Sequence, residues 1–312
     1  MSRFVSGNAQ PILVTGLPRS GTTWLARQLT RAPGLALAGR EPMNPRAKQF
    51  ALGGTLHAWT RLGEAATVEQ RRTLRRVYQG REPRVYSRYG VRQWSAALPT
   101  TRLVVKDPFA LLSLPLLNEV TSARPVILFR HPGALLASYL RMGWSPAVQE
   151  IAALRLVPSD RGGPPAEPPR EVDAVAAMTW FWSTCYNAVL DDLATVPSAV
   201  LVDHAELARG GDEALRRLMV TCDVPAANLR KGPSVRARSA SRRTGRDTDT
   251  KPALHSFDRT AVEVAEAWRG SMSAEDALRV EELTASTWAM MRERRLRLDS
   301  RETDAAKGME RR

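Results

Sequence analysis

The stretch Pro11–Leu29, PILVTGLPRSGTTWLARQL, joins a short apolar run to a helical pattern through a turn that contains two glycines. Gly16 and Gly21 occupy the glycine positions of the GxxxxGK[ST] phosphate-binding loop, and Thr23 matches its last position. Thr22 stands where that loop has its lysine. Backbone N–H groups of such a turn and the N-terminus of the following helix attract an anion, so we expect an anion at this loop.

The loss of the lysine indicates which anion fits. In nucleotide triphosphatases the lysine reaches the β- and γ-phosphates, so a loop without it holds a triphosphate poorly. Arg19, two residues before Gly21, supplies a different cation, and Ser20, Thr22 and Thr23 supply hydroxyl donors. The pattern therefore favours a single phosphate that carries one reactive group.

The segment from Pro18 to Leu25 resembles the 5′-phosphosulfate loop of sulfotransferases that use 3′-phosphoadenosine 5′-phosphosulfate (PAPS). In that family a Lys or Arg precedes Ser-Gly-Thr-Thr-Trp, and here Arg19 precedes Ser20, Gly21, Thr22, Thr23 and Trp24. The resemblance implies that Arg19 and the loop amides bind the 5′-phosphate and the sulfuryl group, with Trp24 against the adenine. It also implies adenosine 3′,5′-bisphosphate (PAP) as the product.

A second motif follows in the order that the family shows. Residues 126–139, VILFRHPGALLASY, form a buried-looking strand that ends at Arg130, then Pro132 at a first helical position, then Ser138 about two turns into a helix. Ligands of open α/β sheets bind at the carboxyl ends of strands, where Arg130 emerges. The pair is similar to the family's 3′-phosphate site, which implies that Arg130 and Ser138 hold that phosphate.

The catalytic base is predicted from two strand ends. Glu41 follows the second candidate strand. Several bacterial members of the family have a Glu-Pro pair here and use the carboxylate as base, so the resemblance favours Glu41. The alternative is that the Glu41 carboxylate only stabilises the N-terminus of a helix. Lys106 matches the lysine of the family's Lys-Thr-His element, but Pro108 replaces the histidine. The resemblance implies that Lys106 stabilises the transferring group. Asp107 is a second candidate base, and no pattern singles out a catalytic histidine.

Two later regions are expected to contact the ligands. The resemblance implies that a basic C-terminal loop closes over the 3′-phosphate, with candidates Arg236, Arg238, Arg242, Arg243 and Arg246; a basic loop that binds nothing is the alternative. Acceptor recognition is expected from residues 47–89 and 144–182. The aromatic candidates there are Trp144, Trp180, Phe181 and Trp182, although aromatic residues at helical spacing also suit a core.

Alternating short apolar runs and amphipathic segments predict an α/β fold: a single domain over residues 1–312, with a mostly parallel five-stranded sheet flanked by helices. Residues 157–169 and 234–258 are expected to be loops, and residues 1–10 and about 300–312 flexible. The expected strands are Ile12–Thr15, Leu35–Ala38, Arg102–Val105, Pro125–Phe129 and Ala199–Val202. The expected helices are Thr22–Arg31, residues around Ala47–Leu62, Val68–Tyr78, Ala110–Val120, Gly133–Met142, Val172–Ala194, Thr260–Arg269 and Ala274–Leu298.

Composition restricts the function classes. The net charge of +14 favours an anionic partner, with one basic concentration at Arg71–Arg92. No apolar run suits a membrane helix and no signal peptide is evident, so we expect a cytoplasmic protein without stable membrane insertion. His and Cys do not cluster, so no metal is expected.

The leading hypothesis is a PAPS-dependent sulfotransferase that acts on a hydroxyl of a small-molecule or carbohydrate acceptor. One alternative is a P-loop nucleotide kinase or triphosphatase, for which Val202-Asp203 is the one candidate Walker-B strand end. The other is a basic nucleic-acid-binding protein. That reading is disfavoured because no recognised nucleic-acid motif is present and the arginines are scattered, so we expect no nucleic-acid partner.

Overall fold

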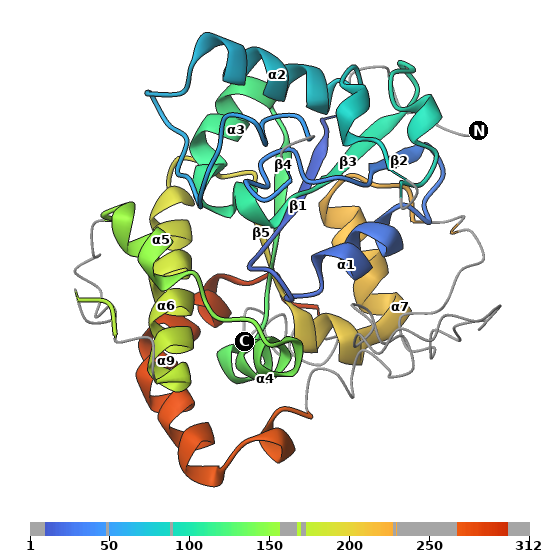
Figure 1. Cartoon of the computed structure of the whole chain (residues 1–312). Helices are drawn as coiled ribbons and strands as arrows, with labels where there is room; N and C mark the ends of the chain where they lie inside the picture. Colours follow the sequence, from blue (N-terminus) through green and yellow to red (C-terminus); the bar gives the residue numbers. More distant parts are fainter. Residues whose placement is uncertain are drawn as a thin grey trace, which may run out of the picture.

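The fold is built on one sheet of five parallel strands in the order β2-β3-β1-β4-β5 (Figure 1). The structure is a computed structural model that describes residues 10–47, 50–87, 90–156, 167–169, 173–226, 229 and 267–298. The strands are β1 Ile12–Thr15, β2 Leu35–Ala38, β3 Arg102–Lys106, β4 Arg124–Phe129 and β5 Val200–Asp203. This confirms the predicted α/β class, and each predicted strand is correct to within one residue at either end.

Helices cover both faces of the sheet, as the buried apolar runs require of parallel strands. Leu13 and Val14 are neighbours in β1 but point to opposite faces, and they belong to two separate hydrophobic clusters. Figure 1 shows α1 and α7 on one side of the sheet and α5, α6 and α9 on the other. The helices are α1 Thr22–Leu29, α2 Val68–Tyr78, α3 Leu114–Thr121, α4 Pro132–Met142, α5 Val148–Ala153, α6 Ala174–Asp192, α7 His204–Thr221 and α9 Ala274–Arg294.

Several helix ends follow from local side-chain chemistry. Thr67 and Gln70 form a reciprocal capping box at the start of α2, whose predicted bounds are confirmed. Ser273 accepts a hydrogen bond from the Asp276 N–H at the start of α9. Helix α9 ends at Arg294 and not at Leu298.

The predicted helix around Ala47–Leu62 is wrong for the residues that the structure describes. Residues 50–62 form turns, and their backbone N–H groups are used elsewhere: Trp59 donates to Glu150 Oε2 at 2.8 Å and Leu62 to Ser113 Oγ at 2.9 Å. The adjacent Gly53 and Gly54 disfavour a helix. Residues 50–62, at the start of the first expected acceptor segment, therefore form a loop and not a helix.

One other helix prediction needs correction, and two helices were missed. The segment predicted as one helix at Ala110–Val120 is a 3-10 turn, Pro108–Ser113, followed by α3, because Pro115 starts a new helix at its first turn. Helices α5 and α7 were not predicted. The loop expected at residues 234–258 and most of those at 157–169 and of the helix Thr260–Arg269 lie outside the described residues.

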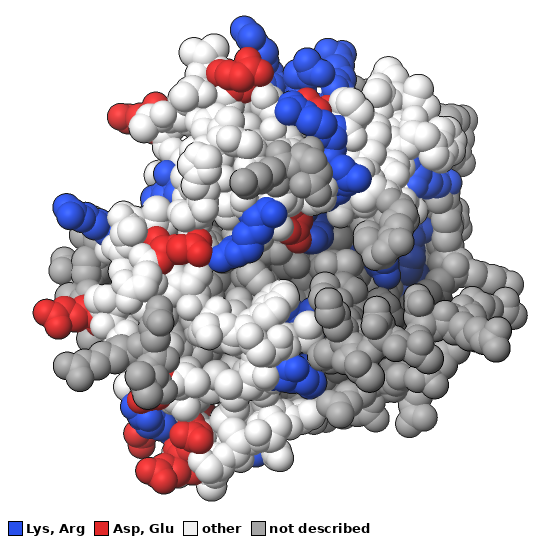
Figure 2. Space-filling model, viewed as in Figure 1, with Lys and Arg blue, Asp and Glu red and all other residues white. Residues whose placement is uncertain are grey.

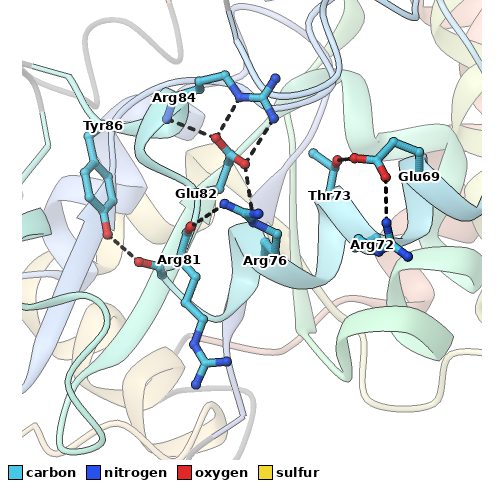
Figure 3. Close-up of polar contacts among 9 residues, drawn as sticks. Glu69, Arg72, Thr73, Arg76, Arg81, Glu82, Arg84 and Tyr86 are labelled. Atoms are coloured by element: carbon cyan, nitrogen blue, oxygen red, sulfur yellow. Dashed lines mark hydrogen bonds and ion pairs between the residues drawn. The ribbon is translucent and has the colours of Figure 1, made fainter.

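In the described part of the basic segment Arg71–Arg92, residues 71–78 belong to α2 and Pro83–Val85 forms a short 3-10 helix. Glu82 is only 3% exposed and accepts from Arg84 Nε at 2.7 Å, while Arg76 Nε lies 3.7 Å from its other oxygen (Figure 3). Arg72 pairs with Glu69 at 3.2 Å on the same helix. Figure 2 shows Lys and Arg gathered over α2 at the top of this face. Internal carboxylates thus offset part of this charge.

Candidate active site

Strand order brings the predicted anion-binding segments together. β1 pairs with β4, with Thr15 opposite Ile127, so the loop after β1 and Arg130 after β4 emerge side by side. After β1 the chain continues to β2, on one side of this pair, and after β4 it continues to β5, on the other side. The point between two strands whose connections diverge in this way is the usual position of a ligand crevice in an open α/β sheet. β2 and β3 also pair, which places Glu41 and Lys106 at the same edge.

The loop after β1 needs its two glycines. Gly16 has φ +145° and a Cβ there would lie 2.1 Å from the Leu128 carbonyl oxygen. Gly21 has φ +96° and a Cβ there would lie 2.8 Å from Cδ2 of His204. Arg19 itself has φ +73°, a strained conformation for a residue with a side chain, of the kind that clusters at functional sites.

Arginines and one serine converge beside this loop. The Arg19 Nε donates to Ser138 Oγ at 3.2 Å, and Arg130 donates to the Arg19 carbonyl oxygen at 3.1 Å. Burial, with the charge of Arg141 second, lowers the pKa of Arg19. Burial also lowers the pKa of Arg130 to about 10, and the charges of Arg141 and Arg19 add to this shift. Because these cations destabilise one another, a bound anion would relieve their repulsion.

Two side chains of α6 contact the backbone of both predicted anion-binding segments. Trp182 Nε1 donates to the Arg130 carbonyl oxygen at 3.0 Å. The Tyr186 phenol oxygen accepts from the Leu17 N–H at 3.4 Å and lies 3.4 Å from the Leu128 carbonyl oxygen. Trp182 is fully buried, so its predicted place in the acceptor pocket is wrong: its ring belongs to the support of the anion site.

The remaining loop residues lie as follows. Thr22 and Thr23 line the cleft described below, and Gly21 precedes the first residue of α1. Ser20 is fully buried, with its side chain beside the Tyr186 phenol. Trp24 is half-buried and its ring centroid lies 5.8 Å from that of His204.

Glu41 and Lys106 form an ion pair that faces the same cleft. The second carboxylate oxygen of Glu41 accepts from Asn44 Nδ2 at 2.6 Å. The Asn44 oxygen in turn accepts from the Arg46 N–H at 2.9 Å, which fixes the orientation of the amide. Sequence reasoning missed Asn44; its position three residues after Glu41, in a Pro-containing turn, is the signal that could have indicated it.

Asp107, His131 and His204 do not line the cleft. Asp107 is fully buried, and its two oxygens accept from the N–H groups of Met43 at 2.6 Å and Phe109 at 3.0 Å. Burial raises its pKa to about 8, and the charge of Glu41 adds to this. His131 Nδ1 accepts from the Gly133 N–H at 3.2 Å as the cap of α4, and burial lowers its pKa to about 4.

A cleft of about 690 Å³ extends from the loop toward α5 and α6. At one end it is lined by Arg19, Thr22, Thr23, Glu41 and Lys106. Its other walls are mainly apolar and include Trp59, Phe109, Tyr139, Trp144 and Phe181. Of the four aromatic residues predicted for an acceptor pocket, Trp144 and Phe181 line the cleft; Trp180 is 6% exposed in the core.

Some predictions fall outside what the structure describes or concern absences. The five candidate arginines between Arg236 and Arg246 lie outside the described residues. Within the described ranges, no group of three or more His, Cys, Asp or Glu side chains is arranged to hold a metal ion. None of the helices in the described part of the chain has the length and apolar character needed to span a bilayer.

Fold and site together define an α/β protein in which a turn with Gly16 and Gly21 joins β1 to α1, as in a P-loop, with Thr22 at the position of the P-loop lysine and Arg19 in the same turn. The sequence profile of the sulfotransferase family matches residues 11–228, more than half of the 312 residues. The chain therefore belongs to the sulfotransferase family. No match was found among curated proteins.

Solved structures of sulfotransferases are similar to this chain over most of its length. The sulfotransferase domain of the Synechococcus PCC 7002 olefin synthase is 19% identical, with TM-score 0.44, over 90% of this chain and 96% of that one. A sulfotransferase from Alicyclobacillus acidocaldarius is 15% identical, with TM-score 0.41, over 91% of this chain and 100% of that one.

Proposed function

We propose that this protein transfers a sulfuryl group from PAPS to a hydroxyl of a small-molecule or carbohydrate acceptor. The observation that carries the proposal is the convergence of Arg19, Arg130 and Ser138, from three different segments, on one region beside the phosphate-binding loop. Two cations from different segments, Arg19 and Arg130, suit a ligand that carries phosphates at both its 5′ and 3′ positions. Family membership supports the same donor.

The residues present fit such a donor. Glycines at positions 16 and 21 let the loop turn tightly against Leu128 and His204, and α1 directs its N-terminal N–H groups toward this loop. Arg19 would bind the 5′-phosphosulfate, and Arg130 with Ser138 the 3′-phosphate. When bound, the donor supplies the sulfuryl group; the protein supplies charge, orientation and a base.

Glu41 is the proposed base. It would accept the proton of the acceptor hydroxyl while the acceptor oxygen bonds to sulfur and the bond from sulfur to the bridging phosphate oxygen breaks. The electron pair of that bond would leave on the 5′-phosphate, where Arg19 and the start of α1 stabilise it. Lys106, which lines the cleft beside Glu41, would stabilise the negative oxygens of the transferring group.

The alternative bases and the nucleotide triphosphatase hypothesis have less support. Both oxygens of Asp107 accept from backbone N–H groups in a fully buried position, which leaves no access to an acceptor. Asp203, the candidate Walker-B residue, is 5% exposed and its carboxylate caps α7 by accepting from the Ala205 N–H at 2.8 Å.

Calorimetry with PAP and adenosine 5′-monophosphate tests the donor. We expect the wild-type protein to prefer PAP, and Arg130→Ala to weaken PAP binding by about 10- to 100-fold with little effect on the monophosphate, since one charge-assisted contact is lost. Ser138→Ala provides a milder variant of the same site, and Arg75→Ala on α2 is the control. Equal affinity of the wild type for both nucleotides would contradict the proposal.

A further inference from the structure

We infer that the acceptor is a flat apolar alcohol, such as a phenol or a fused-ring alcohol, and not a carbohydrate. The inference rests on the proposed function, because it concerns the other half of the same cleft. It narrows the acceptor from any hydroxyl compound to one chemical class, on the basis of what lines the space beyond Glu41 and Lys106.

The acceptor end of the cleft is aromatic on more than one side. The ring of Trp59 lies 4.8 Å from that of Phe109 and 5.9 Å from that of Phe181, both measured between centroids. Tyr139 and Trp144 form a second contact, with centroids 5.8 Å apart and planes at 87°. An apolar wall of this kind binds a ligand by removing apolar surface from water.

These rings are packed into the wall of the cleft. Trp59 is 3% exposed, Phe109 8%, Tyr139 5% and Phe181 1%, so most of each ring contacts other protein groups and only a small part borders the cleft. Trp144, at 40%, is the most exposed of the five. Walls made mainly of ring carbons favour a flat apolar ligand over a puckered sugar, because they offer no partners to the sugar's outward hydroxyls.

Two polar side chains near the aromatic walls already have partners. Asn44 is engaged by Glu41 and by the Arg46 N–H, and Arg46 pairs with Glu150 at 2.8 Å. A sugar would bring several hydroxyls against walls that are mainly aromatic, where a hydroxyl that finds no partner loses its bonds to water. Each such hydroxyl is expected to reduce affinity roughly tenfold. A phenol brings one hydroxyl, and Glu41 is there to accept from it.

The loop that carries Trp59 is held in place without a ligand. Glu150 Oε2 accepts from the Trp59 N–H, and Arg61 makes a two-pronged contact with Asp192 at 2.5 and 3.1 Å. The Asp192 side chain is only 5% exposed, so α6 anchors the loop. This wall of the cleft is thus preformed, which reduces the entropic cost of binding a rigid ligand.

Trp144 connects the two halves of the cleft. Its ring contacts Tyr139 on the acceptor side, and the Arg19 guanidinium lies 5.9 Å from its centroid on the donor side. As the most exposed of the five rings, it can be changed with little cost to the core. We therefore assign Trp144 as the residue that most directly determines acceptor affinity.

The test measures binding of 2-naphthol and of methyl β-glucoside to the full-length protein saturated with PAP, by calorimetry. We expect the dissociation constant of 2-naphthol to be at least about 30-fold lower, since each glucoside hydroxyl left without a partner reduces affinity and the naphthyl ring buries more apolar surface. With PAPS, mass spectrometry should detect naphthyl sulfate at a kcat/KM that exceeds that of the glucoside by a similar factor.

Trp144→Ala should raise the dissociation constant of 2-naphthol about tenfold and that of PAP by no more than about fivefold, since only a cation–π contact to Arg19 is lost on the donor side. The control is Trp94→Ala, which removes a tryptophan that is 81% exposed and does not line the cleft. It should change neither constant.

Two results would overturn the inference: no binding of 2-naphthol at millimolar concentration, or equal binding and turnover of the glucoside. In either case normal PAP binding would leave the proposed function standing. If PAP itself fails to bind, the proposed function fails, and the inference about its acceptor fails with it.

Discussion

The residues that contact Glu41 determine whether its carboxylate can act as the proposed base and take the proton of an acceptor hydroxyl. The carboxylate contacts Lys106 through one oxygen and Asn44 through the other, and it lines the cleft beside the anion site. Two contacts from opposite sides leave the carboxylate with one orientation. This arrangement suits a group that must meet an acceptor hydroxyl in a defined geometry.

Glu41→Gln should lower kcat by about 100-fold or more, since a general base commonly contributes that factor, while the dissociation constant of PAP stays within about twofold. Turnover and calorimetry on the same preparation provide both numbers. Glu64→Gln changes an exposed glutamate outside the cleft and serves as the control. Normal turnover of Glu41→Gln would rule out this residue as base.

Asn44→Ala should lower kcat by about tenfold without changing PAP affinity, because the amide positions Glu41 and is not expected to touch the donor. An Asn44→Asp variant should be at least as impaired, since a second carboxylate would be placed beside Glu41. If Asn44→Ala has wild-type kcat, Lys106 alone is sufficient to orient the base.

Among the elements, α6 supports the anion site from the core. Trp182 contacts the carbonyl of Arg130, and the Tyr186 phenol contacts the backbone at Leu17 and Leu128. Periodicity in residues 172–194 predicts the helix but not this role, because which ring lies under which strand end depends on how α6 packs on the sheet. The apolar composition of α6 suits a helix that is buried nearly all round.

Tyr186→Phe should raise the dissociation constant of PAP about three- to tenfold and lower the melting temperature by a few degrees, because the hydroxyl that contacts the loop is lost. The matched control is Tyr86→Phe, which removes a hydroxyl that donates to the Gly80 carbonyl oxygen at 2.6 Å, away from the cleft. It should cost stability but not affinity. An equal loss of affinity in both variants would mean that stability alone explains the effect.

For the molecule as a whole, charge is unevenly placed. Figure 2 shows basic residues over α2 and acidic ones at the lower end of the same face, over the start of α9. The arginines of α2 do not line the cleft, whereas Arg19 does. The net charge of +14 therefore does not by itself locate the site; the buried cations near the loop do. That the protein does not bind nucleic acid stays a prediction.

Acid should destabilise the whole fold through its buried histidines. Burial lowers the pKa of His204 to about 3, below its usual 6.5, so the unfolded chain binds a proton that the folded chain excludes. Stability is therefore full above pH 6.5 and falls as the pH drops toward 3. The contribution of His204 is roughly 2–4 kcal/mol between pH 7 and pH 4.

Melting temperatures from pH 7.5 to pH 4 check this linkage. His204→Leu should flatten the decline relative to wild type, while His57→Leu, at an exposed histidine, should leave it unchanged. An identical decline in wild type and His204→Leu would show that other groups dominate acid unfolding.

Much of this arrangement could be predicted from local patterns. The five strands, α2, and the position of the loop around Gly16 and Gly21 follow from apolar periodicity and turn chemistry, which act over a few neighbouring residues. Arg130 and Ser138 could be placed at a strand end and on the next helix for the same reason. The role of each side chain at the proposed site remains a proposal.

What the local patterns could not predict depends on contacts between distant segments. The loop at residues 50–62 is not a helix because its N–H groups bond to Glu150 and Ser113, which lie 91 and 51 residues away in the chain. The pairing of Asn44 with Glu41 and the burial of Asp107 and Trp182 also emerge only when β2, β3 and α6 pack together. Amino-acid order was enough for the strands and the glycine turn, since their energetics are local. Partners, burial and the shape of the cleft were set by packing, because each depends on which surfaces meet in three dimensions.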